Sequence, residues 1–259
     1  MRKGARRVLL RSWQGFMRRA RLMSCVGSVA LTMGTSASAE ILSARYDDPT
    51  TRYAHGVLGD AVEYGALILK VAGSDDSGFR KTLTLRFALP ETRVFEDLEP
   101  RLADIDGDGL PEVIVIESDA RLGASLAIYD ATGKIASTPF IGRTNRWLAP
   151  LGATDLDGDG KVELAYIDRP HLAKTLRVWR YDDGELKHVA DVPGLTNHRI
   201  GEDFISGGIR NCGDGPEIVT ASDDWSRVMV TRLEGGRLSS RDEGPFKGQN
   251  SLRNALRCH

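Results

Sequence analysis

The sequence predicts an all-β repeat protein, and three observations support this. Two nine-residue acidic stretches, Asp104–Glu112 and Asp155–Glu163, are near copies of one another. Each is followed by short apolar runs rich in Val, Ile, Leu and aromatic residues and separated by Gly and Asp turns, a pattern typical of strands. A degenerate copy, Asn211–Glu217, lies downstream. A period near fifty residues indicates one supersecondary unit repeated along the chain.

Each repeat is expected to contain three or four short strands. In the two clearest repeats the third Asp of the acidic stretch lies 25 residues before a turn Gly, Gly133 or Gly184, and a further strand follows that turn. A fainter copy begins at Gly59. The apolar runs that we predict as strands are Leu67–Leu69, Thr82–Leu85, Val113–Ile116, Leu126–Tyr129, Leu164–Ile167, Leu176–Trp179, Ile218–Thr220 and Val228–Val230.

Repeated antiparallel sheets of this size are the pattern of propeller blades, which bury their faces only by stacking on one another. We therefore expect residues 40–259 to form one domain, a β-propeller of about four blades with calcium loops between strands. Closing the ring requires its two ends to meet. Because Phe246–Leu252 resembles Phe140–Arg146, which enters the second clear repeat, the C-terminal tail is expected to complete the first blade near His55–Leu69.

The first 39 residues are predicted to be a cleaved export signal. Eight basic and no acidic residues precede the apolar run Leu22–Met33, and Ala37–Ala39 supplies a small-residue cleavage site. The basic stretch is long for a signal, and Met17 is an alternative start to Met1. We expect the mature protein to be periplasmic or secreted. No other segment is long and apolar enough to span a membrane.

Cleavage changes the charge and the cysteine count. The mature chain keeps 27 of the 35 basic side chains and all 36 acidic ones, a formal net charge of −9. This balance argues against a nucleic-acid partner, which needs clustered positive charge. Two cysteines remain, Cys212 and Cys258, and an even pair in an exported protein suggests one disulfide. Two buried free thiols are the alternative.

The acidic stretches have the spacing of calcium loops. Carboxylates at loop positions 1, 3, 5 and 9 can converge on one hard cation, and Gly at position 6 permits the sharp turn that this needs. An EF-hand is excluded, because its position 12 requires a bidentate Glu and these stretches carry Val115 and Tyr166 there.

Both nonapeptides resemble the calcium loops of FG-GAP (VCBS-type) repeats, found in integrin α-subunit propellers and related bacterial proteins. The family pattern is Asp-x-Asp-x-Asp-Gly-x-x-Asp followed by a strand, and both stretches carry Glu in place of the last Asp. The resemblance implies two Ca²⁺ sites with a mainly structural role. The implied ligands are Asp104, Asp106, Asp108, the Leu110 carbonyl and Glu112 at the first site, and Asp155, Asp157, Asp159, the Lys161 carbonyl and Glu163 at the second.

No catalytic constellation is evident in the sequence. It contains no Gly-x-Ser-x-Gly elbow and no phosphate loop. The five histidines appear scattered, and we interpret them as surface or turn residues. Trp147, Trp179 and Trp225 recur once per repeat and are interpreted as blade core rather than as a carbohydrate platform.

Two functions remain open. The favoured one is an exported calcium-binding propeller that acts as a binding module for a protein or glycan partner, with no enzymatic activity. The alternative is an exported hydrolase or lyase with its active site in the propeller channel. That alternative requires polar residues from several blades to line one pocket, and the candidates are Arg143, Asn145, His198 and Arg199.

Overall fold

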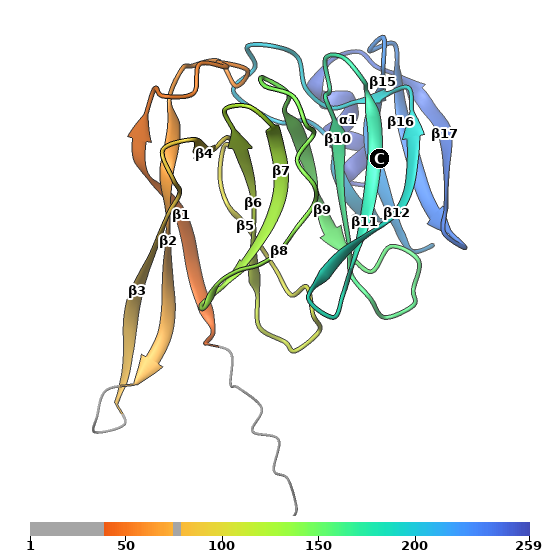
Figure 1. Cartoon of the computed structure of the whole chain (residues 1–259). Coiled ribbons are helices and arrows are strands. Elements are labelled where there is room, and N and C mark those ends of the chain that lie inside the picture. Colours follow the sequence, from red (N-terminus) through yellow and green to blue (C-terminus); the bar gives the residue numbers. More distant parts are fainter. Residues whose placement is uncertain (1–38, 75–78) are drawn as a thin grey trace, which may run out of the picture. The chain divides into compact units, whose positions relative to one another are not determined.

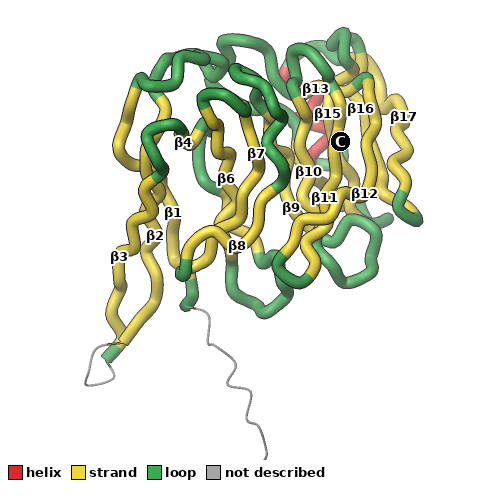
Figure 2. Tube along the Cα trace, in the orientation of Figure 1, coloured by secondary structure: helices red, strands yellow, loops and turns green. Residues whose placement is uncertain are grey.

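The computed structural model describes residues 39–74 and 79–259, which belong to one compact unit. The predicted export signal falls on residues 1–38, which lie outside the described residues. Seventeen strands and one helix make up the described part, and the strands are antiparallel (Figures 1 and 2). The prediction of an all-β fold is therefore confirmed. Within these described ranges no helix has the length and apolar character of a membrane span.

The first sheet contains the strands of two repeats. A three-stranded N-terminal unit is joined to a second unit by a single residue pair between β2 and β4, Tyr64 with Phe95. The strands of this sheet are β1 (Ile41–Thr50), β2 (Glu63–Ser74), β3 (Arg80–Ala88), β4 (Arg93–Phe95), β5 (Arg101–Ala103), β6 (Glu112–Asp119), β7 (Gly123–Asp130) and β8 (Gly133–Ser137).

The other two sheets each hold one repeat, and their last three strands are connected in the same way. The second sheet is a simple meander in the order β9–β10–β11–β12, and in the third both β13 and β14 pair with β15. Their strands are β9 (Leu148–Thr154), β10 (Glu163–Asp168), β11 (Thr175–Asp182), β12 (Glu185–Pro193), β13 (Leu195–Thr196), β14 (Gly208–Asn211), β15 (Pro216–Ser222), β16 (Arg227–Glu234) and β17 (Arg237–Pro245). Every predicted apolar run lies in one of the observed strands.

The repeats pack face to face through alternate residues of their central strands. In β6, Val113 and Val115 pack toward the N-terminal unit, whereas Ile114 and Ile116 pack toward the second sheet. Since side chains of a strand alternate between its two faces, a strand buried on both faces reads as a continuous apolar run. β10 of the second sheet repeats this arrangement, with Leu164 and Tyr166 packing toward the first sheet and Ala165 and Ile167 toward the third. These successive, similarly connected sheets form a propeller-like architecture.

The prediction for the C-terminal tail is wrong. Residues 249–256 form helix α1 (Gln249–Leu256), which packs on β14, β15 and β16 of the last sheet. Leu252 and Ala255 of α1 are buried against Val219, Val228 and Val230. No pairing joins the described tail to β1–β3. The outer face of the last sheet is thus covered by a helix, and the sequence similarity of the tail to the entry segment of another repeat did not extend to its conformation.

The β1–β2 loop, residues 51–62, makes contacts with the other repeats. Arg52 donates to the carbonyl of Arg93, and the carbonyl of Val57 accepts from Gly201 in the third sheet's connecting segment. Val57 and Leu58 are buried in the core between the first and second sheets. One loop therefore contacts all three sheets, and it carries His55 to the place where they meet.

Candidate functional site

The first acidic loop connects β5 to β6 and is curled by its own side chains. The carboxylate of Asp104 accepts from the backbone N–H groups of Gly107 at 2.8 Å and Gly109 at 3.1 Å. Asp106 and Asp108 each accept from the backbone two residues on. Both glycines have φ near +80°, a conformation that disfavours other residues. The side chain of Asp104 therefore closes the loop into a tight turn, and all three aspartates remain exposed to solvent.

Glu112 forms the floor of this loop at the start of β6. It is buried, and its Oε2 accepts from Ile105 N at 2.8 Å. Burial, with the nearby charges of Asp106 and Asp108, raises the pKa of Glu112 to about 7. Each of Asp104, Asp106 and Asp108 offers an oxygen within 4.8 Å of the others. In the described ranges none of these four carboxyl groups is ion-paired to a basic side chain.

This donor set fits calcium. Calcium takes six to eight oxygen ligands, and carboxylates without a protein counter-charge are its usual partners. The four carboxyl-bearing residues predicted at the first site are thus brought to one loop. Ligation by the Leu110 carbonyl stays a prediction, as does occupancy of the site.

The second acidic loop, between β9 and β10, has the same backbone design. Asp155 accepts from Gly158 at 2.7 Å and Gly160 at 2.9 Å, and buried Glu163 accepts from Leu156 N at 2.8 Å. Oxygens of Asp155, Asp157 and Glu163 lie within 4.8 Å of one another. Asp159 accepts from Lys161 N at 2.9 Å, and ligation by the Lys161 carbonyl also stays a prediction.

A guanidinium distinguishes the second loop from the first. Arg180 of β11 pairs with Glu163, with Asp157 at 2.6 Å and with Asp159 at 2.9 Å. Sequence reasoning missed this residue. The signal was present in the hairpin, because Arg180 lies directly opposite Glu163 in the β10–β11 register. The second loop therefore fits calcium only if this side chain moves.

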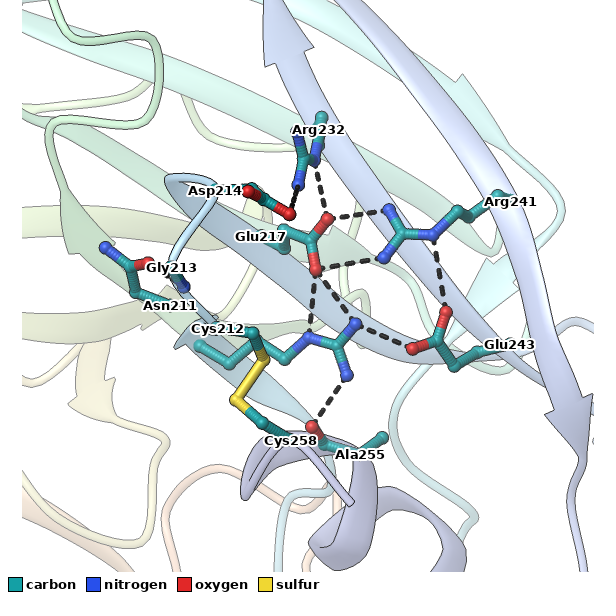
Figure 3. Close-up of a disulfide and its surroundings, with 11 residues drawn as sticks. Asn211, Cys212, Gly213, Asp214, Glu217, Arg232, Arg241, Glu243, Ala255 and Cys258 are labelled. Carbon is teal, nitrogen blue, oxygen red and sulfur yellow. Dashed lines mark hydrogen bonds and ion pairs between the residues drawn. A yellow bond between two sulfur atoms is a disulfide. The ribbon is translucent and has the colours of Figure 1, made fainter.

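In the degenerate copy Asn211–Glu217 more arginines pair with the buried glutamate (Figure 3). Buried Glu217 pairs with Arg210 at 2.8 Å and with Arg232 and Arg241 at 2.6 Å each. Hydrogen bonds from Arg241, then Arg232 and Arg210, lower the pKa of Glu217 to about 2. Here three arginines supply the positive charge that balances the buried carboxylate.

A histidine cluster contradicts the interpretation of scattered surface histidines. His171 Nε2 and His198 Nδ1 lie 2.9 Å apart, and His198 is almost fully buried beneath Trp147, whose ring centroid is 5.0 Å away. His198 donates through Nε2 to the carbonyl of Glu202, so its Nδ1 accepts from His171. Burial, together with the nearby His198, lowers the pKa of His171 to about 4.

His55 faces the same region from the β1–β2 loop. Its Nδ1 donates to the fully buried carboxylate of Glu96, which Ser118 also contacts. A pocket at this place is lined by His55, Asn145, Arg146, Trp147, Arg169, Pro170, His171 and Leu172. Of these lining residues Asn145 and Arg169 have positive φ, a conformation that often marks functional sites. Neither the spacing nor the composition of the sequence brings these side chains together.

The four channel candidates are only partly brought together. Asn145 lines the pocket and His198 lies behind it, in contact with His171. Arg199 instead lies over the ring of Trp225 at 4.3 Å, and Arg143 is exposed away from the pocket lining. Trp147 and Trp179 pack in or against the core between the first and second sheets, as predicted, whereas Trp225 packs against the core between the last sheet and α1.

The acidic loops are similar to a known repeat family. Residues 104–166, which include both loops, match the model of the FG-GAP-like repeat, and this confirms the predicted resemblance over that part of the chain. No curated protein sequence matches the chain. Among solved structures, the exotype rhamnogalacturonan lyase YesX aligns with 17% identity and a TM-score of 0.37, over 80% of this chain and 50% of that one. The chain thus spans about half the length of that structure.

Proposed function

We propose that this protein is an exported β-propeller-like binding module for a protein or glycan partner, in which a calcium ion holds the loop Asp104–Glu112. The observation that carries the calcium role is the charge balance of that loop. Three exposed carboxylates converge there near the buried carboxyl group of Glu112, and none of the four is paired to a basic side chain in the described part of the chain. Such an arrangement is unfavourable until a cation binds.

The role of the ion is structural. It binds the folded loop and not the unfolded chain, so calcium at one hundred times its dissociation constant adds about 2.7 kcal/mol to the free energy of unfolding. The loop lies between β5 and β6, and β6 is buried on both faces. Holding the loop in place therefore also holds β5 and β6 of the first sheet and the surface loops beside them.

Calcium titration of the mature chain by calorimetry, with melting in calcium and in chelator, tests this proposal. We expect calcium-dependent heat and a higher melting temperature, both reduced by Asp106→Ala. Asp214→Ala is the matched control, because Asp214 is an exposed acid in the degenerate loop. Absence of binding up to millimolar calcium, with identical melting in chelator, would overturn it.

Export and partner binding complete the proposal and have their own tests. N-terminal sequencing of the protein recovered outside the cytoplasm should find Glu40 as the first residue. Recovery of the uncleaved chain in the cytoplasm alone would contradict export. Binding to immobilised glycans and surface proteins, compared in calcium and in chelator, identifies the partner.

A second candidate function rests on the histidine pocket. His55, held by Glu96, and His171, whose pKa is lowered to about 4, line the same pocket, and two such imidazoles can transfer protons in a hydrolase or lyase. The test is activity of the purified protein on polysaccharide and ester substrates, with His55→Ala and His171→Ala as variants. Exposed His188→Ala is the control. Activity lost in both pocket variants and kept in the control supports an enzyme.

A further inference from the structure

The two acidic loops differ in the residue that faces their buried glutamate. In the β10–β11 hairpin Arg180 lies opposite Glu163. In the β6–β7 hairpin Val113 pairs with Tyr129, and continuing that register by one residue brings Asp130 opposite Glu112. Asp130 is occupied with its own turn, where it accepts from Thr132 and Gly133. The first loop therefore faces an acid, and the second faces a permanent cation.

The third repeat extends this comparison. Opposite Glu217, continuing the β15–β16 register by one residue, lies Arg232, and Arg210 and Arg241 reach the same carboxylate. Within the described residues, the number of arginines paired with the buried glutamate rises along the chain from none at Glu112 to one at Glu163 and three at Glu217. Over the same order the Asp-x-Asp-x-Asp pattern is kept twice and then lost. Positive charge on the strands thus increases as the acidic pattern is lost.

Arg180 does not satisfy the second loop completely. Its guanidinium donates to Asp157 Oδ2, while Asp157 Oδ1 is buried and has no hydrogen-bond partner among the described residues. A buried carboxylate oxygen without a partner is costly. The Arg180 side chain is 23% exposed, so it has a route to solvent. The second loop therefore keeps one buried carboxylate oxygen that could bind a metal ion, although the Arg180 guanidinium already lies in the loop.

We propose that Arg180 is the resident counter-cation of the second loop, and that its guanidinium and a calcium ion exclude one another there. The two near-identical loops are then unequal sites. Calcium binds the first directly, and at the second it must first break three ion pairs. Arg180 and Asp159 are partly exposed, which weakens their ion pair, whereas the pair with Glu163 is buried; the expected penalty is about tenfold to hundredfold in affinity.

The inference rests on the proposed calcium role of the first loop, and the experiment separates the two. Calcium titrations are run on the Asp106→Ala protein, in which only the second loop remains intact, with and without Arg180→Met. Methionine keeps an unbranched apolar stem and removes the charge. Arg180→Lys keeps the charge. Arg177→Met is the matched control, because Arg177 is a β11 arginine that pairs with Asp168 and Asp191 away from the loop.

We expect Arg180→Met to tighten calcium binding at the second loop at least about tenfold, and Arg180→Lys and Arg177→Met to leave it weak. Circular dichroism and melting in chelator verify that each variant is folded. If Arg180→Met is unfolded, the wild type compared with Asp157→Ala still measures whether the second site is weaker. Equal affinity of both loops in the wild type, or no gain in folded Arg180→Met, overturns the inference. If the wild-type protein binds no calcium at the first loop but Arg180→Met still tightens binding at the second, only the proposed function is overturned.

Discussion

Cys258 is bonded to Cys212, which lies in the turn between β14 and β15 (Figure 3). The predicted disulfide is therefore present, and it fixes the end of α1 on the last sheet. The carbonyl of Ala255 accepts from Arg210 at 2.7 Å, and Arg210 in turn pairs with Glu217. A covalent bond, a buried arginine and an apolar helix face thus act together on one edge of the protein.

Removing the disulfide should destabilise the protein through its unfolded state. For a bridge between residues 46 apart in sequence, chain-entropy arguments give about 4 kcal/mol. We expect Cys212→Ser with Cys258→Ser to lower the free energy of unfolding toward that limit, with the earliest loss of hydrogen-exchange protection in α1. Denaturant melts of the oxidised wild type and the double variant measure it. Identical midpoints would contradict a stabilising bridge.

Leu252 should be the main apolar anchor of α1. It is 1% exposed and packs with Val219, Val228 and Val230. Leu252→Ala removes buried methyl groups and leaves a cavity, which costs about 2–5 kcal/mol. Exposed Arg253→Ala on the same helix is the control, with an expected change within about 0.5 kcal/mol. Equal effects of the two variants in denaturant melts would show that the helix does not cover the sheet.

The strands and acidic loops were predictable because their signals are local. A run such as Val113–Ile116 is apolar at every position since both faces of β6 are buried, and the Asp-Gly spacing defines each turn. The tail was not predictable in this way. Similarity to Phe140–Arg146 predicts that Phe246–Leu252 enters a blade. Its conformation instead depends on the apolar face of the last sheet, which α1 covers.

The parts of the site that were missed depend on contacts between distant residues. His171 and His198 are 27 residues apart in the sequence. His55 lies in the β1–β2 loop, whose conformation cannot be inferred from the repeat pattern. The position of Arg180 depends on a more local feature, the register of one hairpin. The repeats share a spacing of 25 residues between loop and turn, but their hairpins differ in register by one residue, which brings an arginine opposite Glu163.

Gly123, at the start of β7, should be intolerant of any side chain. Its φ is +72°, and a Cβ there would collide with the carbonyl oxygens of Arg143 and Arg146, the latter at 2.8 Å. Gly123→Ala must displace the segment that carries Asn145 into the histidine pocket. Gly142→Ala has the same backbone strain and open space around its Cβ. We expect Gly123→Ala to cost at least roughly 2 kcal/mol more than this control. Equal melting temperatures would contradict the close approach.

Glu63 should make stability depend on pH. Burial, with the charges of Glu96, Asp60 and Asp97, raises the pKa of this 3% exposed carboxyl group to about 9. The folded state therefore keeps a proton that the unfolded chain loses above its ordinary pKa near 4.5. Because the folded state binds more protons over that interval, its stability falls as pH rises from about 4.5 to 9.

Glu63→Gln removes this titration while keeping a similar shape. We expect it to raise the melting temperature at pH 8 by roughly 2–8 °C, an effect of about 1–2 kcal/mol, and to change it little at pH 4.5. Glu91→Gln is the control, since Glu91 is 92% exposed. Melting curves from pH 4.5 to 9 measure the slope. If the wild type and Glu63→Gln proteins lose stability in parallel over this range, the buried carboxyl group is not the cause, and the loss originates in the other acidic clusters of the chain.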